Sequence, residues 1–380
     1  MRVALIGANG HGHWHRRHLA QRPAFDVVAL CDLQPIADVE GAPVDRDTAL
    51  FTDHRAMLAA TTPDLVIVCT PPHTHLALAC DALRAGCDVL LEKPPLLSSA
   101  EHASLSAVCA STGRAVQVGF QALGSAALAE VLAAVDAGAL GTVTGVSALA
   151  AWQRPDAYYT RAPWAGRRRV NGQPVIDGAL VNPLAHAVMQ AAAVAAATGD
   201  PSISTVELSR HRTRRIEVED TAVMRVTTAT GLPVVVAVTL CGEEFIPGEI
   251  TVHGTSGRAV LEYPTDRVTL PGETARRDVP GRTSLLDNLA AHRRDRTVPL
   301  IVPLDRTAPF TRLVEVIAEA PDPAPVPPAL VTSSGAGDER RLTIAGINEA
   351  LRTCADQLAM PHEVGLTWAG PATRIQLTPR

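Results

Sequence analysis

Hydrophobic residues in the first third of the chain form short continuous runs, and most runs are followed by a stretch with helical spacing. The runs predict strands over residues 2–7, 25–32, 64–70, 88–93 and 115–120, and the spacing predicts helices over about 12–22, 75–86 and 98–113. Apolar strands that alternate with helices indicate a parallel sheet covered on both faces. Ser99 is expected to cap the third of these helices, with Ser98 as the alternative.

The pattern changes after about residue 122. A helix is expected over 125–137 and an Ala-rich helix over 183–198, and β-type segments joined by glycine turns follow between residues 204 and 270. Consecutive strands of this kind favour an α+β domain with a mostly antiparallel sheet and helices on one face. A Pro- and Gly-rich surface loop is expected over 320–340, and a last amphipathic helix over 342–358. The chain is therefore predicted to form two domains, residues 1–121 and 122–380.

Composition narrows the class of protein. The 380 residues carry a net charge of −5, which gives no overall field to attract nucleic acid or an anionic membrane. The basic runs 167–169 and 210–215 are interpreted as solvated surface. Seven scattered cysteines without a C-x-x-C pair favour a reducing compartment. With no signal-peptide pattern and no apolar stretch of about 20 residues, the protein is expected to be soluble and cytoplasmic.

A glycine-rich turn separates the first predicted strand from the first helix. The phosphate-binding pattern G-x-G-x-x-G would place glycines at positions 7, 9 and 12, and here Asn occupies the middle position. Asn tolerates a positive φ better than most residues, and the next residue is a glycine. The residues expected to contact the cofactor here are Gly7, Ala8, Asn9, Gly10, His11 and Gly12. Asp32, 20 residues after Gly12, is expected to bind the adenosine ribose and to favour NAD over NADP.

Histidines crowd the start of this helix, and His11, His15 and His18 share one helical face. A metal pair at i, i+4 is a possible interpretation, but no Cys, Asp or Glu lies nearby in the sequence to complete a ligand set. Several arginines of the same helix would also repel a dication. No metal site is therefore expected, and His11 is expected to lie close to the cofactor phosphates.

Lys93 is the only lysine in the chain, against 33 arginines. It follows a predicted parallel strand at its carboxyl end, where such sheets bind ligands. A position that keeps an ammonium in an arginine-rich chain indicates a need for a compact donor that can change its protonation state. Lys93 is therefore a candidate for the donor that stabilises a developing alkoxide.

Several motifs recur in an order that resembles the Gfo/Idh/MocA family of NAD(P)-dependent oxidoreductases. They are "GANGHG" (7–12), "CTPPHTH" (69–75), "LLEKP" (90–94), "NPLAH" (182–186) and "HGTSG" (253–257). The resemblance implies a Rossmann domain with a doubly wound parallel sheet, followed by a domain with a large open sheet. It also implies hydride transfer between a nicotinamide cofactor and a sugar, cyclitol or related polyol, and a homodimer or homotetramer formed through the C-terminal sheet.

The resemblance also assigns roles to residues of the first domain. It implies that Thr70 and Pro71 line the nicotinamide side, that His75 and Glu92 contribute to cofactor binding, and that Lys93 contacts the reacting hydroxyl. The peptide bond between Lys93 and Pro94 is a candidate for the cis form.

In the second domain, the resemblance makes His186 the acid/base partner of Lys93. The family pattern has an aspartate four residues before this histidine, where this chain has Asn182. Asn182 followed by a proline is also expected to cap the helix 183–198, and Asp177 is a candidate for supplying the missing charge. Substrate contacts are expected from an aromatic loop and the end of the first domain, through Gln121, Tyr158, Tyr159, Arg161 and Trp164, although these side chains equally suit an interface.

The combined expectation is an NAD-dependent dehydrogenase or reductase for a polyol-like substrate. The main alternative is a catalytically weak NAD-binding sensor of the same fold, which the departure at Asn182 favours and Lys93 with His186 disfavours. A third interpretation keeps the enzyme but changes the reaction to reduction of an enone, an imine or an aromatic dihydrodiol.

Overall fold

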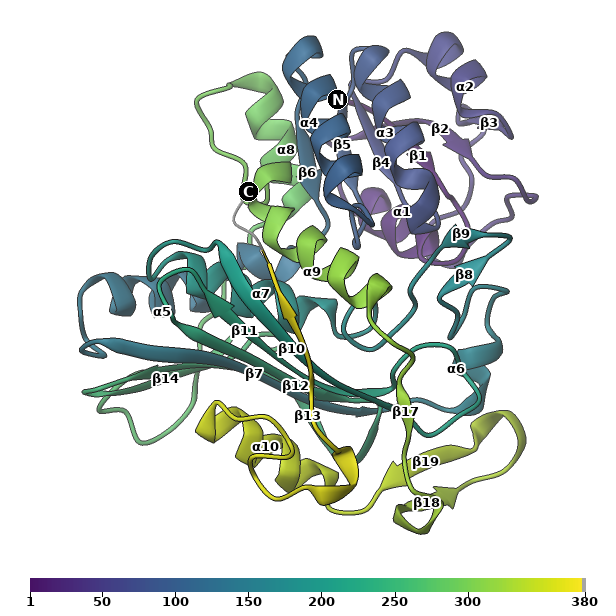
Figure 1. Ribbon diagram of the computed structural model, residues 1–380. Helices are drawn as coiled ribbons and strands as arrows, with labels where there is room; N and C mark the ends of the chain where they lie inside the picture. Colours follow the sequence, from purple (N-terminus) through teal and green to yellow (C-terminus); the bar gives the residue numbers. More distant parts are fainter. Residues whose placement is uncertain (378–380) are drawn as a thin grey trace. The chain divides into compact units, whose positions relative to one another are not determined.

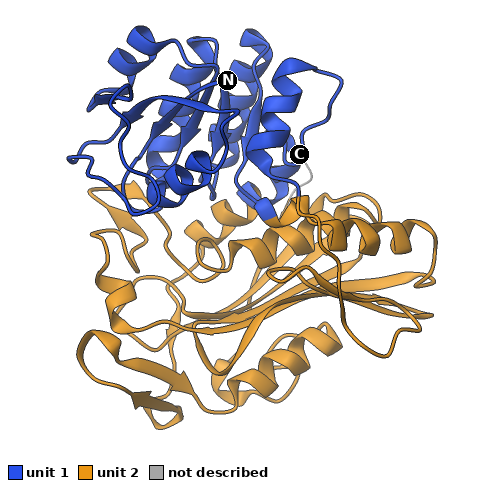
Figure 2. Ribbon diagram, turned by 180° about the vertical axis from the view of Figure 1, so that it is seen from behind, with its two compact units in different colours: residues 1–121, 283–311 blue, residues 122–282, 312–380 orange. Residues whose placement is uncertain are grey.

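The computed structural model describes residues 1–377, which divide into two compact units. Unit 1 consists of residues 1–121 and 283–311, and unit 2 of residues 122–282 and the described residues from 312 onward (Figure 2). The chain passes from unit 1 to unit 2 after residue 121. Residues 283–311 differ from the prediction, because they belong to unit 1 and not to the second domain.

Unit 1 is built on a six-stranded parallel sheet of the order β3-β2-β1-β4-β5-β6 (Figure 1). Its strands are β1 Arg2–Ile6, β2 Asp26–Cys31, β3 Ala49–Phe51, β4 Leu65–Val68, β5 Asp88–Leu91 and β6 Val116–Val118, and its helices include α1 Gly12–Ala20, α2 His54–Thr61, α3 His75–Arg84, α4 Ser99–Thr112 and α8 Leu285–Arg294. This is the strand order of the doubly wound dinucleotide-binding fold. The predicted Rossmann architecture is therefore confirmed.

Several local details of unit 1 differ from the expectation, among them helix α2, which was not predicted. The cap of α4 is Ser98, the alternative to Ser99, and its hydroxyl accepts a hydrogen bond from the Glu101 amide at 3.2 Å. The short strand β3 was not predicted, because three residues are too few to show an apolar run. None of these details changes the order of the longer strands.

The returning segment 283–311 is held against unit 1 by buried polar contacts. The fully buried Asp88 carboxylate accepts hydrogen bonds from Arg293 at 2.9 Å and from Arg296 at 3.0 Å. Gln117 donates to the Leu285 carbonyl at 3.2 Å and accepts from the Val302 amide at 2.8 Å. A buried carboxylate and a buried amide need such partners, and unit 1 obtains them from residues almost 200 positions away.

Unit 2 contains a ten-stranded sheet of the order β16-β15-β14-β13-β7-β12-β11-β10-β17, with β20 paired to β10. The strands are β7 Val143–Gln153, β10 Ile203–Arg212, β11 Thr221–Thr228, β12 Pro233–Thr239, β13 Cys241–Gly254, β14 Gly257–Glu262, β15 Arg267–Thr269, β16 Arg277–Asp278, β17 Ala324–Pro325 and β20 Thr373–Gln376. The β7–β12 and β10–β17 pairs are parallel and the other pairs are antiparallel. The predicted large, mostly antiparallel sheet is thus confirmed.

Helices cover both faces of this sheet, and not one face as the sequence pattern suggested (Figure 1). Helix α7 (Ala185–Ala196) packs on one face, and α10 (Ile347–Gln357) packs on the other with the hairpin of β18 (Val331–Ser334) and β19 (Arg341–Ile344). The hairpin lies partly in the stretch predicted as an irregular loop. Its strands have only four residues each, so their alternation is too short to outweigh the surrounding prolines and glycines.

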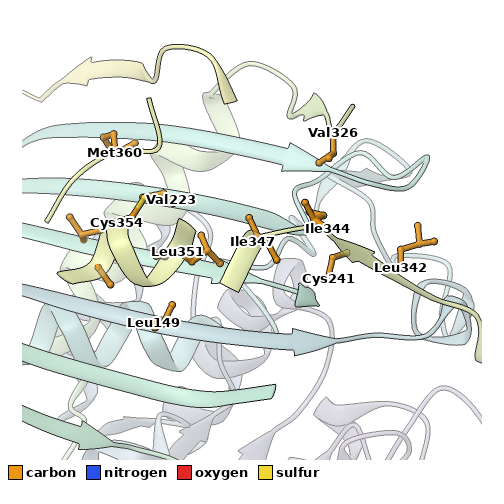
Figure 3. Packing of buried hydrophobic residues seen from close by; sticks show 13 residues of the cluster. Leu149, Val223, Cys241, Val326, Leu342, Ile344, Ile347, Leu351, Cys354 and Met360 are labelled. Atoms are coloured by element: carbon orange, nitrogen blue, oxygen red, sulfur yellow. The ribbon is translucent and has the colours of Figure 1, made fainter. Parts of the chain in front are cut away.

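An apolar cluster attaches this C-terminal segment to the sheet (Figure 3). From the sheet it includes Leu149 and Val223, and from the segment it includes Ile344, Leu351 and Met360. Ion pairs add to this contact, since Arg225 of β11 pairs with Glu363 at 2.7 Å and Arg352 of α10 pairs with Glu249 at 3.1 Å. The C-terminal segment therefore covers one face of the sheet over β7, β11, β12 and β13. The homodimer or homotetramer expected through this sheet stays a prediction.

Two further findings concern the expectations from composition. Within residues 1–377, no helix combines the length and the apolar character needed to cross a bilayer. All seven cysteines are free thiols, and five of them are buried.

The cluster under α10 predicts how a substitution affects stability. Leu351 is 2% exposed, so Leu351→Ala removes buried methyl groups and leaves a cavity. The free energy of unfolding in urea, followed by circular dichroism, is expected to fall by about 2–5 kcal/mol. The control Gln357→Ala changes an exposed residue of the same helix and is expected to stay within about 0.5 kcal/mol of the wild type. Equal losses in the two variants would contradict the packing described for Leu351.

Candidate functional site

The turn between β1 and α1 depends on two glycines that leave no room for a side chain. Gly7 has φ +88°, and a Cβ atom there would lie 2.1 Å from the Cys69 carbonyl oxygen at the end of β4. A Cβ atom on Gly12 would lie 2.0 Å from the Gly7 carbonyl oxygen. The absence of both Cβ atoms lets the start of α1 pack directly on the strand ends. Backbone at the positive end of α1 is thereby brought to the edge of the sheet where phosphate can bind.

Asn9 takes a different part in this turn from the expected one. It is not among the residues with positive φ, and Gly10 takes that conformation instead, at φ +55°. The Asn9 amide donates to Asp32 Oδ2 at 3.0 Å, and its side chain donates to the Pro35 carbonyl at 3.3 Å. Asp32 also accepts from the Gln34 amide at 3.0 Å. The half-buried Asp32 carboxylate is thus fixed at the end of β2, beside the glycine turn.

A buried carboxylate lies beneath the start of α1. Glu92, immediately after β5, accepts a hydrogen bond from His15 Nε2 at 2.9 Å, and His11 Nε2 lies 3.7 Å from the same oxygen. Burial raises the pKa of Glu92, but the hydrogen bond from His15 and the neighbouring positive charges outweigh burial and hold it at about 2. Burial lowers the pKa of His11, and Glu92 offsets this only in part. Glu92 is therefore ionised at neutral pH.

Lys93 follows this carboxylate at the carboxyl end of β5. Its backbone amide donates to Glu92 Oε2 at 3.1 Å, and the Lys93–Pro94 peptide bond is cis, the form for which the sequence made it a candidate. A Cβ atom on Gly119 would lie within 3.0–3.1 Å of the Glu92 carboxylate, so close packing also fixes this side chain. The half-buried Lys93 side chain is close enough to lower the pKa of His11 and of Glu92.

The segment after β4 is connected to the segment after Lys93 through His75. The ring of His75 is fully buried, with Nε2 2.8 Å from the Thr70 carbonyl and Nδ1 3.0 Å from the Pro94 carbonyl. The Thr70 and Thr74 hydroxyls are 2.7 Å apart, and Thr74 donates to the Pro71 carbonyl at 2.7 Å. His75 therefore holds the backbone of the predicted nicotinamide-side residues and does not offer its own ring to a ligand.

The structure overturns one of the two reasons for expecting no metal, the lack of a further ligand beside the histidines. Ligand atoms of His11, His15 and Glu92 lie within 4.8 Å of one another, so a carboxylate does accompany the two histidines. This carboxylate, Glu92, lies 77 residues after His15 in the chain, so the sequence around the histidines does not indicate it. A dication would still lie at the positive end of α1 and close to the Lys93 ammonium, and both oppose it electrostatically. The cluster is better suited to fixing the phosphate-binding turn.

In unit 2, Asp177 connects several of the residues predicted to act on the substrate. Its buried carboxylate accepts from Arg161 Nη2 at 2.9 Å through both oxygens, from the Gly166 amide at 2.8 Å and from the Asn182 side chain at 2.6 Å. Arg161 thus compensates the Asp177 charge directly, and Asp177 contacts Asn182 directly. That Asp177 supplies charge to His186 stays a prediction.

Asn182 does not cap the following helix, and that prediction is wrong. Helix α7 begins at Ala185 with Leu184 in the N-cap position, so His186 lies in its first turn. A carboxylate only accepts hydrogen bonds, so Asn182 donates to Asp177 through its amide nitrogen, at 2.6 Å. The chain forms turns over residues 179–184, so α7 begins at Ala185, two residues later than Asn182 and Pro183 predict.

The aromatic loop, here residues 154–166, is held together by stacked arginines. The Arg161 guanidinium lies 3.7 Å from the centre of the Tyr158 ring and 4.6 Å from that of Trp164. Tyr159 is placed differently, because the Arg214 guanidinium covers its ring at 4.7 Å and its hydroxyl is buried. Burial, with Asp220 nearby, raises the pKa of Tyr159 well above its usual value. Tyr159 therefore serves packing within unit 2.

The predicted site residues form two groups, one in each unit. The group in unit 1 consists of Lys93, Glu92, Asp32 and the glycine turn. Gln121 ends the first segment of unit 1 and begins a short 3-10 helix (Gln121–Gly124). The group in unit 2 consists of Asp177, Asn182, His186, Tyr158, Arg161 and Trp164. The functional contact missed from the sequence is the one from His15 to Glu92, for which a separation of 77 residues left no local signal.

Comparison with known proteins identifies the class of protein that these groups define. Residues 1–120 match a model described as an oxidoreductase family with an NAD-binding Rossmann fold. Residues 128–260 match the Gfo/Idh/MocA C-terminal domain, and the two matches together cover more than half of the chain. The chain belongs to the Gfo/Idh/MocA family of oxidoreductases, and unit 1 contains its NAD-binding domain.

Curated relatives match over shorter stretches. D-glucoside 3-dehydrogenase of Escherichia coli (strain K12) is 36% identical over 104 residues, which is 26% of this chain and 28% of the relative. Inositol 2-dehydrogenase 4 of Saccharopolyspora erythraea is 33% identical over 151 residues, which is 37% of this chain and 42% of the relative. The matched part thus spans less than half of each of these two relatives.

Solved structures support the fold over most of the chain. The WlbA dehydrogenase from Bordetella pertussis, in complex with NADH and UDP-GlcNAcA, has a TM-score of 0.67 at 21% identity and covers 83% of this chain and 95% of its own. An oxidoreductase from Agrobacterium radiobacter, in complex with NAD⁺, L-tartaric acid and magnesium, has a TM-score of 0.68 at 17% identity, with 84% and 95% covered.

The glycine turn predicts a contrast between two neighbouring substitutions. Gly7→Ala forces Cβ against the Cys69 carbonyl, whereas Gly10→Ala, also at positive φ, meets nothing within 4 Å. The first is expected to lower the free energy of unfolding by more than about 3 kcal/mol, and the second by about 1 kcal/mol. Thermal unfolding of the protein without added nucleotide measures both. A Gly10→Ala variant as unstable as Gly7→Ala would mean that φ, and not the close approach, limits the turn.

Proposed function

We propose that the protein transfers a hydride between NAD and a secondary alcohol or ketone of a sugar, cyclitol or other polyol. One observation carries the proposal: the only lysine of the chain directly follows a buried, ionised carboxylate at the carboxyl end of β5, in the NAD-binding unit. Glucoside and inositol dehydrogenases among the relatives favour this substrate class.

The residues present fit a dinucleotide. The turn at Gly7 and Gly12 is free of Cβ atoms at the positive end of α1, as a pyrophosphate requires. The Asp32 carboxylate is held at the end of β2, where it would accept hydrogen bonds from the ribose hydroxyls and repel a 2′-phosphate. When bound, NAD⁺ accepts the hydride, and the chain's own residues must handle the proton and the developing charge.

In the proposed mechanism, the Lys93 ammonium donates a hydrogen bond to the substrate oxygen and stabilises its negative charge as the proton leaves. His186 takes that proton in the direction of alcohol oxidation and returns it in the direction of ketone reduction. Asn182, oriented by Asp177 at 2.6 Å, presents Oδ1 as a neutral acceptor where an aspartate would present a charge. Arg161 and Trp164 of the aromatic loop are proposed to contact the polyol.

The preference for NAD over NADP predicts an effect at Asp32. Asp32→Ser removes the carboxylate that repels a 2′-phosphate, so the affinity for NADP⁺ relative to NAD⁺ is expected to rise by about tenfold or more. Calorimetric titration with each dinucleotide measures the ratio. The control Asp47→Ser makes the same charge change at an exposed position after β2 and is expected to leave the ratio unchanged. Similar affinities of the wild type for both dinucleotides would overturn the assignment.

The proposed pair predicts a loss of turnover without a loss of cofactor. Lys93→Ala and His186→Ala are each expected to reduce turnover at least about a hundredfold, because a donor or a base is removed from the reaction. The affinity for NADH is expected to stay within about tenfold, and the control His362→Ala, at an exposed position, to keep wild-type turnover. The assay follows nicotinamide absorbance with NAD⁺ or NADH and a panel that includes myo-inositol and methyl β-D-glucoside.

The same panel separates the enzyme from the sensor. A wild-type chain that binds NADH and turns over no member of the panel in either direction would favour the alternative, a catalytically weak NAD-binding sensor. Asn182 in place of the family's aspartate is the observation that supports that alternative. Wild-type turnover in both variants would refute the assignment of Lys93 and His186.

A further inference from the structure

We propose that the C-terminal hairpin β18–β19 stabilises the aromatic loop for substrate binding, and that Arg340 and Asp156 are the positioning residues of this contact. The proposal rests on the proposed function in one respect, namely that the aromatic loop contacts the substrate. The contact between hairpin and loop lies wholly within unit 2.

The tip of the hairpin is joined to the loop through both backbone and side chains. The Asp156 amide donates to the Arg340 carbonyl at 2.9 Å, and Pro155 forms an isolated antiparallel bridge with Arg341. In the same place, Arg340 Nε donates to Asp156 Oδ2 at 2.7 Å. At the base, the Gln153 side chain donates to the Thr343 hydroxyl at 3.1 Å. The hairpin therefore touches the loop at several points along its entry.

Asp156 is shared between the hairpin and the interior of unit 2. Its second oxygen accepts from Arg214 Nε at 2.9 Å, and Arg214, with a side chain only 7% exposed, also donates to the Arg154 carbonyl at 3.0 Å. Burial raises the pKa of Asp156, but hydrogen bonds from Arg214 and Arg340 outweigh burial and lower it below the usual value. The ionised carboxylate thus bridges a buried and a half-exposed arginine.

The helix that begins at Asp156 depends on these contacts for its conformation. Helix α6 (Asp156–Thr160) has five residues, far fewer than a helix needs to be stable by itself in water. Arg154 lies 5.1 Å from the centre of the Tyr158 ring, and the opposite side of the loop continues through Arg161 to Asp177. A shift of α6 would therefore reach the residues proposed to contact the substrate.

The hairpin β18–β19 is itself anchored to the core of unit 2. Leu342 and Ile344 of β19 belong to the apolar cluster between α10 and the sheet (Figure 3). Its turn also has a fixed shape, because Gly335 has φ +73° and a Cβ atom there would lie 2.8 Å from the Glu339 carbonyl oxygen. The contact with the loop is thus held by the core of unit 2 and does not depend on a mobile tail.

Hydrogen exchange provides the first test, since it needs no substrate. Arg340→Gln and Asp156→Asn are each expected to speed amide exchange in peptides that cover residues 156–164 by about fivefold or more. Arg340→Lys keeps a positive charge and is expected to restore much of the protection. The matched control is Arg341→Gln, because that arginine pairs with Glu339 at the exposed end of the same hairpin. Unchanged exchange in Arg340→Gln would overturn the proposal, whatever the activity.

Steady-state kinetics provides the second test. It uses NAD⁺ and those members of the panel that the wild type is found to oxidise. Arg340→Gln is expected to raise KM for the polyol about three- to tenfold and to leave kcat and the affinity for NADH within about twofold. A fall in kcat with KM unchanged would contradict a role in positioning the substrate. A wild type without turnover would refute the proposed function, and the exchange experiment would then decide on the hairpin contact by itself.

Discussion

The close approach of β1, β4 and α1 at Gly7 is the constraint on which the rest of unit 1 depends. No side chain fits between the turn and the Cys69 carbonyl, so the ends of the central strands can align at one edge. That edge then receives the Asp32 carboxylate from β2 and Glu92 from β5. The buried His15–Glu92 hydrogen bond fixes the start of α1, and the close approach of Gly12 to the Gly7 carbonyl holds the turn against it. The residues that pack most closely in unit 1 therefore lie beside the residues predicted to bind the cofactor.

Local sequence could predict only those features that lie within one strand and the turn that follows it. The glycine turn, Asp32 and Lys93 each follow an apolar run, and parallel strands must bring such positions to one edge. The contact between His15 and Glu92 could not be predicted in this way, because it depends on how two strands are ordered in the sheet. The return of residues 283–311 to unit 1 likewise follows from the needs of buried Asp88 and Gln117. These two side chains require hydrogen-bond partners only because the fold buries them, so the local sequence does not indicate the requirement.

Unit 2 shows where a locally sound rule fails. Asn followed by Pro is a good helix start, yet Asn182 turns to Asp177, which is itself held by Arg161. The hairpin β18–β19 was hidden because only Leu342 and Ile344 mark its buried face in a stretch rich in glycine and polar residues. In both cases, a charged or apolar partner that lies elsewhere in the sequence outweighs the local preference.

Lys93 has a consequence for the chemistry that can be performed on the protein from outside. It carries the only side-chain amine of the chain, and it is half-buried beside Glu92. Acylating reagents, aldehydes and lysine-modifying enzymes act on such an amine, whereas the other strongly basic side chains of the chain are guanidinium groups, which react with them far less readily. Labelling of side-chain amines in this protein therefore reports on one position, Lys93. If a dinucleotide bound in the proposed site shields Lys93, the fraction of Lys93 that stays unlabelled measures the fraction of sites that are occupied.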